Sequence, residues 1–188
     1  MARNPQRRSE LADAGLRILA REGARGLTHR AIDDEAGVPK GTTSNYFRSR
    51  DDVIAGLVGR IGERLAPDPA VLDSLANRTP SRELFADYTR DIVARLLGNR
   101  EVTLALFELR LEASRRPEIR DILGHWQTSS FRSDVEFNSS AGLPGGTREI
   151  ALFHYAIDGL LLDRLTYPLD PDTSTDDIVD ALVEGLLR

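Results

Sequence analysis

Apolar residues recur at helical spacing along the chain, and this periodicity constrains the fold more than any other feature. Leu11, Gly15, Ile18 and Leu19 occupy positions i, i+4, i+7 and i+8, so they share one face of a helix. Similar stripes recur in later segments, and none of these segments shows the strict apolar and polar alternation typical of a strand. The sequence therefore predicts an all-α fold.

Capping residues, prolines and glycines predict where the helices begin and end. Thr28 and Ser49 are expected N-caps, and Gly37 is expected to end a helix in the left-handed conformation. Thr79 and Pro80 are expected to begin another helix. We expect about nine helices: one that ends near residue 23, then 28–36, a short segment that closes at 47, 49–65, 79–98, 100–115, 117–139, 147–166, and one from 174 to the end.

A proline-rich stretch around residues 67–80 is the best candidate for a domain junction. We therefore expect a small N-terminal domain at residues 1–50 (the head), a connecting helix at about 50–65, and a larger helical domain at residues 66–188 (the body).

The charge of the chain is divided unevenly between these parts. The net charge of −5 disfavours a nucleic-acid partner if it is taken as a whole. However, residues 1–50 hold ten Lys and Arg against six Asp and Glu, net +4, whereas the remainder holds fifteen against twenty-four, net −9. A basic head on an acidic body is expected when one small module meets phosphate.

Several classes of protein are disfavoured by residues that the sequence lacks. There is no cysteine, which excludes disulfides and thiolate metal sites, and His29, His125 and His154 show no ligand spacing. We therefore expect neither metal nor cofactor. The first residues contain no apolar signal segment, and the apolar stretch 150–162 is too short to span a bilayer. We expect a cytoplasmic protein without a membrane partner.

The segment 28–50 carries the most information about function. A capped helix is followed by Gly37-Val38-Pro39 and then by four short polar residues, 42–45, which are mediocre helix formers. Such side chains suit a helix that enters the major groove and reaches base edges. Composition alone would equally allow a polar loop between two helices.

The spacing within this segment resembles the TetR family of transcriptional regulators. The matching positions are Leu27-Thr28, Ala36-Gly37-Val38, Gly41, Tyr46-Phe47 and Arg50, where the family usually has Lys. The resemblance covers about residues 9–58 and implies a three-helix head with a helix-turn-helix. It also implies a helical body that binds an effector and forms a homodimer.

The resemblance implies roles for individual residues of the head. We expect DNA contacts from Thr28, Lys40, Gly41, Thr42, Ser44, Asn45, Tyr46 and Arg50. Among these, Thr42, Ser44 and Asn45 are expected to face bases, and Gly41 lets the backbone approach the DNA. The others are expected to contact phosphate. Thr43 departs from the apolar residue common at its position, and Phe47 is expected in the core.

Two sets of body residues are also expected to be functional. The helix at 147–166 has two apolar faces, which suggests the monomer core on one side and a partner on the other. We expect a dimer interface from Leu152, Ala156, Gly159, Leu162, Leu182 and Gly185. The apolar stripe of the helix at 117–139 continues into serines, which suits an effector pocket. Its expected lining is Tyr88, Phe107, Trp126, Ser130, Ser133 and Tyr155, although each aromatic residue is also compatible with plain core.

The sequence thus predicts a repressor that a small, largely apolar effector releases from a pseudo-palindromic operator of double-stranded DNA. The alternatives are a helical enzyme or a protein-binding scaffold with a helix-turn-helix-like head. The enzyme is disfavoured because the sequence contains no recognisable nucleophile set or metal motif. Salt-dependent binding of DNA distinguishes the repressor from the scaffold.

Overall fold

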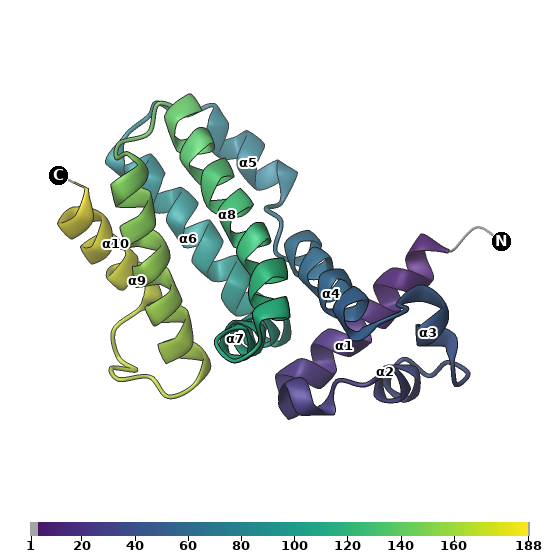
Figure 1. Ribbon diagram of the computed structural model, residues 1–188. Helices are drawn as coiled ribbons and strands as arrows, with labels where there is room; N and C mark the ends of the chain where they lie inside the picture. Colours follow the sequence, from purple (N-terminus) through teal and green to yellow (C-terminus); the bar gives the residue numbers. More distant parts are fainter. Residues whose placement is uncertain (1–3, 188) are drawn as a thin grey trace. The chain divides into compact units, whose positions relative to one another are not determined.

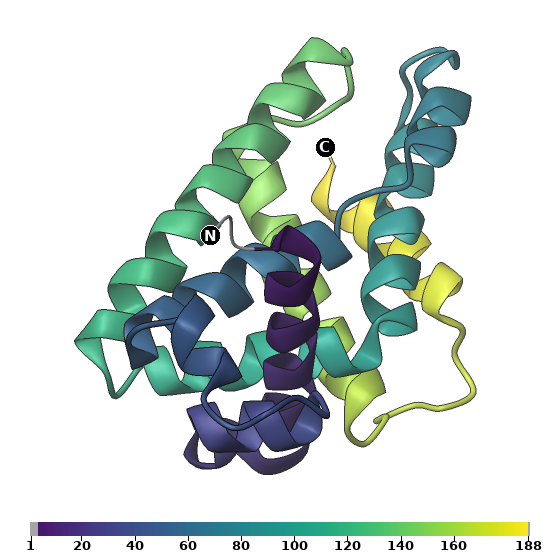
Figure 2. The same cartoon turned by 90° about the vertical axis from the view of Figure 1, so that its right-hand side faces the viewer.

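The computed structural model describes residues 4–187, and helices are the only regular elements among them (Figures 1 and 2). The helices are α1 (Pro5–Gly26), α2 (His29–Glu35), α3 (Thr42–Tyr46), α4 (Arg50–Arg64), α5 (Pro69–Ala76), α6 (Arg82–Gly98), α7 (Arg100–Ala113), α8 (Pro117–Ser140), α9 (Thr147–Leu165) and α10 (Thr175–Leu186). The all-α prediction is confirmed. None of these helices is both long and apolar enough to cross a membrane.

The proline-rich stretch differs from the prediction. It contains the short helix α5, which begins at Pro69 and is capped by the carboxylate of Asp68. The next helix, α6, begins at Arg82 rather than at Thr79 and Pro80. Its cap is Ser81, whose Oγ accepts a hydrogen bond of 3.1 Å from the amide of Leu84. Thr79 and Ser81 are both residue types that cap helices well, and the structure uses Ser81.

Local signals in the head are confirmed. Helical geometry in α1 is interrupted at Gly23, where φ is 69°, close to the predicted end of the first helix. Thr28 caps α2, and Gly37 adopts the predicted left-handed conformation with φ of 64°. Ser49 caps α4 by accepting a hydrogen bond from the amide of Asp52. The side chain of Asp52 in turn accepts a hydrogen bond of 3.0 Å from the amide of Arg48.

The contacts divide the chain into two compact units that are not continuous in sequence. The first unit runs to Ala66 and also includes Asn99–Gln127. In this unit α1 packs against α2, α4 and α7, and Figure 2 shows α1 (purple) running across α4 (blue). The second unit comprises Pro67–Gly98 and the chain from Thr128 onward, in which α6, α9 and α10 pack together.

Candidate nucleic-acid interface

The start of α2 is built by a cap and by a contact with a distant carbonyl. Thr28 is extended, and its Oγ1 accepts a hydrogen bond of 3.1 Å from the amide of Ala31. The adjacent His29 places Nε2 2.8 Å from the carbonyl oxygen of Phe47, beyond the end of α3. This contact ties the first turn of α2 to the residue that follows α3, and the His29 side chain that makes it is half-buried.

The helix α3 exposes the polar side that the sequence predicted. Gly41 precedes it with φ of 86°, a conformation that glycine adopts without strain. Lys40, Ser44 and Asn45 are exposed, so their side chains are available to an external partner. Thr42 is half-buried, and its hydroxyl donates a hydrogen bond of 2.5 Å to the carbonyl of Pro39.

The opposite side of α3 is held by Asp33, a residue that the sequence did not single out. Asp33 is 1% exposed and Thr43 is 0% exposed. One carboxylate oxygen of Asp33 accepts hydrogen bonds from the amide of Thr43 at 2.7 Å and from its hydroxyl at 2.6 Å. The other accepts a bond of 2.7 Å from the amide of Gly41. Two polar residues at inward positions of neighbouring helices were the available signal, because buried polar groups need partners.

Hydrogen bonding stabilises the charged form of Asp33. Burial acts to raise the pKa of this carboxyl, but the bonds from Thr43 and Gly41 outweigh it, aided by the charge of His29. The pKa therefore lies below its usual value, and the side chain is an acceptor at neutral pH.

The end of α3 is anchored by an aromatic ring in the core. Phe47 is 1% exposed, in agreement with its predicted place in the core, whereas Tyr46 is half-buried. Arg8 of α1 donates a hydrogen bond of 2.9 Å to the carbonyl of Tyr46. The same guanidinium lies 4.3 Å from the centroid of the Phe47 ring, which is favourable cation–π geometry.

Arg50 lies beside the start of α2 but already has backbone partners. Its Nη1 donates to the carbonyl of Leu27 at 2.9 Å and its Nη2 to the carbonyl of Ala24 at 2.8 Å. Together with Thr28, it lines a small surface hollow. Each terminal nitrogen carries a second N–H that these two bonds do not use.

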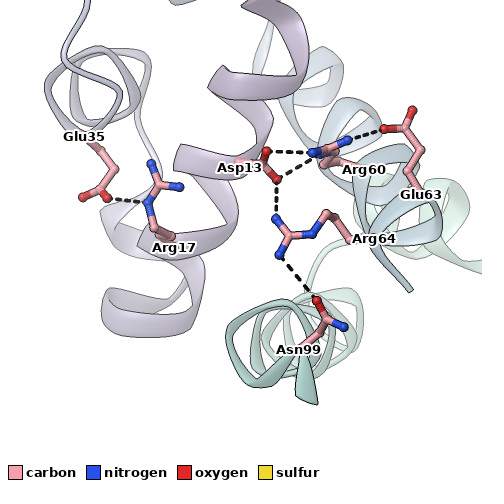
Figure 3. A network of polar contacts seen from close by, with 7 residues as sticks. All are labelled: Asp13, Arg17, Glu35, Arg60, Glu63, Arg64 and Asn99. Carbon is pink, nitrogen blue, oxygen red and sulfur yellow. Dashed lines mark hydrogen bonds and ion pairs between the residues drawn. The ribbon is translucent and has the colours of Figure 1, made fainter. Parts of the chain in front are cut away.

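Ion pairs join α1 to α2 and to α4 (Figure 3). Asp13 of α1 receives bidentate hydrogen bonds of 2.9 and 2.8 Å from Arg60 of α4, and a third bond of 3.1 Å from Arg64. Arg17 binds Glu35 at the end of α2 at 2.7 Å. These bonds hold α2 and α4 against α1.

The predicted dimer residues are exposed or half-buried on α9 and α10. On α9, Gly159 and Leu162 are exposed, the latter by 50%, and Leu152 and Ala156 are half-buried. On α10, Leu182 is half-buried and Gly185 is exposed. A Cβ at Gly159 or Gly185 would meet nothing within 4 Å.

The predicted effector residues are divided between the two units. Tyr88 is buried in the second unit, where its ring lies edge-on to that of Phe137 with 5.1 Å between the ring centroids. Ser130, which is half-buried, and Ser133, which is exposed, belong to the same unit. Phe107 and Trp126 belong to the first unit. Tyr155 is 70% exposed and stands three residues from Leu152 and four from Gly159, on the outer face of α9. Helical spacing alone did not separate the two faces of α9, because both are apolar.

Two family models match most of the chain. The model of the tetR family of bacterial regulatory proteins matches residues 11–57. The model of the tetracyclin repressor-like C-terminal domain matches residues 80–188. A search among curated proteins found no match.

Solved structures of similar fold cover almost the whole chain. A TetR-family member from Streptomyces coelicolor has a TM-score of 0.75 at 24% identity, over 98% of this chain and 99% of that one. The multidrug binding protein EbrR, complexed with imidazole, has a TM-score of 0.69 at 26% identity, over 98% and 97%. FadR from Bacillus subtilis, a transcriptional regulator in complex with stearoyl-CoA, has a TM-score of 0.70 at 17% identity, over 95% and 96%.

Proposed function

The chain belongs to the tetR family of bacterial regulatory proteins, and from this premise we propose that it is a repressor that a small, largely apolar effector releases from its operator. The observation that carries the proposal is the two-sided α3. Ser44 and Asn45 are exposed, while Thr43 on the same short helix is fully buried. A helix held so firmly on one side is suited to present the other to base edges.

The proposed DNA contacts divide into base-reading and phosphate-binding groups. Thr42, Ser44 and Asn45 read bases, and Gly41 lets the backbone come close. Lys40, Tyr46 and the start of α2 at Thr28 contact phosphates on either side of the groove. Arg50 joins this group through the N–H groups that its two carbonyl partners leave available.

We further propose that the protein forms a homodimer through α9 and α10. Leu152, Ala156, Gly159 and Leu162 on α9, with Leu182 and Gly185 on α10, form its interface. Exposure of Leu162 and Tyr155 supports it, because large apolar side chains on one helix face favour burial by a partner. We add Tyr155 to this face and remove it from the effector set. A two-fold dimer presents two heads to a pseudo-palindromic operator.

The effector site is proposed for the second unit, around Tyr88, Ser130 and Ser133. EbrR and FadR have been solved with imidazole and stearoyl-CoA, respectively, which supports a ligand-binding role for a domain of this fold. The effector role expected of Phe107 and Trp126, which belong to the first unit, stays a prediction from the sequence. Because the proposed operator DNA lies in the bacterial cytoplasm, we also propose that the protein works there.

The test begins with selection of an operator from a random DNA library by the full-length protein. Affinity for that operator and for random DNA is then titrated at several salt concentrations. A regulator gives a discrimination of about a thousandfold or more and a steep salt dependence for both DNAs. A protein-binding scaffold selects no sequence. An apolar compound that raises the melting temperature should then release the operator.

A further inference from the structure

The helix α3 lacks the features that stabilise a helix by itself. It has five residues, far fewer than an isolated helix needs in water. Its N-cap is Gly41, which has no side-chain oxygen, and no side chain of its own caps it. The amide of Thr42 bonds the nearby carbonyl of Pro39 at 3.1 Å, so the amides of Gly41 and Thr43 are the ones that depend on an acceptor from elsewhere in the fold.

The carboxylate of Asp33 is that acceptor. It lies on α2, eight residues before Gly41 and ten before Thr43, and it binds both amides and the Thr43 hydroxyl within 2.7 Å. A negative charge at this position also complements the positive end of the α3 dipole. Because Asp33 and Thr43 are buried, water does not compete for these bonds.

We propose that Asp33 is a positioning residue for DNA recognition, which caps α3 from α2 and thereby fixes the direction in which Ser44 and Asn45 point. The inference rests on the proposed DNA-binding function. Thr43 is adjacent in sequence to Ser44, so bonds to both its amide and its hydroxyl set the rotation of α3 about its axis as well as its distance from α2. Asp33 itself does not contact DNA, because its carboxylate is enclosed.

A positioning role differs from a purely stabilising role in what it changes. Loss of overall stability lowers the folded fraction, and affinity for operator and for random DNA falls together. If α3 is no longer held in place, a smaller fraction of the folded molecules can read bases. The apparent operator affinity then falls in proportion to that fraction. Affinity for random DNA depends on phosphate contacts and changes less. The informative quantity is the ratio of operator affinity to random-DNA affinity.

The experiment compares Asp33→Asn with Asp34→Asn in the full-length protein. Both variants remove one negative charge from α2, but Asp34 is exposed, and its carboxylate lies 3.8 Å from the guanidinium of Arg30 on the same helix. We expect Asp33→Asn to lower the affinity ratio about tenfold, since it removes hydrogen bonds to a charged group. Asp34→Asn should leave the ratio within about twofold of the wild type. Circular dichroism at the assay temperature verifies that both are folded.

A second pair of variants keeps the test decisive if Asp33→Asn does not fold. Thr43→Val removes the hydroxyl donor and retains the shape, and should lower the affinity ratio about threefold. Thr43→Ser retains the hydroxyl and should restore it to within about twofold. Amide hydrogen exchange of residues 41–47 should accelerate in Asp33→Asn and in Thr43→Val but not in Asp34→Asn.

Unchanged affinity ratios in Asp33→Asn and Thr43→Val would overturn the positioning role. An equal loss of affinity for operator and random DNA would overturn it as well, because that result indicates stability alone. Failure of the proposed DNA-binding function looks different, since the wild-type protein would then select no operator from the library.

Discussion

At the scale of single residues, the end of α3 is fixed where an aromatic ring meets a glycine. The ring of Phe47 lies against Gly56 of α4, so closely that a Cβ added there would stand 2.3 Å from Cε1 of the ring. Arg8 of α1 covers the same ring. Glycine at position 56 therefore serves close packing between α4 and the residue that ends α3.

Replacement of Gly56 by Ala should destabilise the protein. Phe47 is enclosed, so its ring must shift to admit the new methyl group, and overpacking of this kind costs about 1–3 kcal/mol. The matched control is Gly59→Ala on the same helix, where a Cβ meets nothing within 4 Å. That variant should gain up to about 1 kcal/mol from helix propensity. Urea unfolding measures both, and a gain in both variants would contradict the packing role of Gly56.

Lys40 and Asn45 should affect DNA binding in different ways. Lys40→Ala should weaken binding to operator and to random DNA alike, and reduce the salt slope by about one unit, because it removes a phosphate contact. Asn45→Ala should mainly relax base preference, with a cost of about 1–3 kcal/mol on the selected operator. Both side chains are exposed, so neither change should alter folding. Unchanged operator affinity in both variants would contradict the assignment of α3 as the recognition helix.

The sequence predicted contacts between near neighbours and missed contacts between distant ones. Thr28 and Ser49 each cap an amide three residues ahead, so a local pattern was sufficient. The bonds from His29 to Phe47 and from Arg50 to Ala24 span eighteen and twenty-six residues. They depend on how the helices pack, which local periodicity does not specify. Thr43 departs from the apolar residue common at its position, but no local pattern identifies Asp33 as its partner.

At the scale of elements, α1 and α4 are joined by an ion-pair network centred on Asp13. Burial acts to raise the pKa of Asp13, but hydrogen bonds and charges from Arg60 and Arg64 outweigh it, and the pKa lies below its usual value. The side chains of Asp13 and Arg60 are both largely removed from solvent. The pair is therefore screened less than a surface ion pair.

Asp13→Asn should lower the free energy of unfolding by about 1–2 kcal/mol at pH 7. Because the folded-state pKa is lower than the unfolded value of about 3.9, the wild-type advantage is fully present well above pH 4. It is lost as the pH falls through the folded-state pKa. Urea unfolding between pH 7 and pH 3 measures the difference. Glu63→Gln, at the exposed end of the network, should change stability by less than about 0.5 kcal/mol. A difference between Asp13→Asn and wild type that does not depend on pH would contradict the ionic role.

The helices themselves were largely predictable, and the exceptions lie where signals compete. The long helices carry apolar residues at helical spacing, so their existence followed from periodicity. The helix α5 has only eight residues between prolines, too few to establish a period. The start of α6 had two candidate caps two residues apart, and sequence offers no means to choose between them.

At the scale of the whole molecule, the compact units do not follow the order of the chain. Residues 99–127 pack with the first four helices, although the sequence assigned them to the body. The predicted boundary at about residue 66 rests on the local proline content and charge of the sequence. The packing of α7 on α1 depends instead on the complementary shapes of two apolar faces, which local composition does not specify. The functional division between a DNA-binding head and an effector-binding body remains a prediction, since it concerns what each part binds.

The final prediction concerns assembly through the exposed face of α9. Gly159→Glu should convert the dimer to monomers and abolish tight operator binding, because one head engages only half a site. The monomer should remain folded, since Gly159 is exposed and a Cβ added there meets nothing within 4 Å. The matched control is Gly98→Glu at the end of α6, which adds the same charge at another open position and should leave the dimer intact. Sedimentation equilibrium at micromolar concentration measures the mass of each protein. A wild-type monomer, or a Gly159→Glu dimer as tight as the wild type, would place the interface elsewhere.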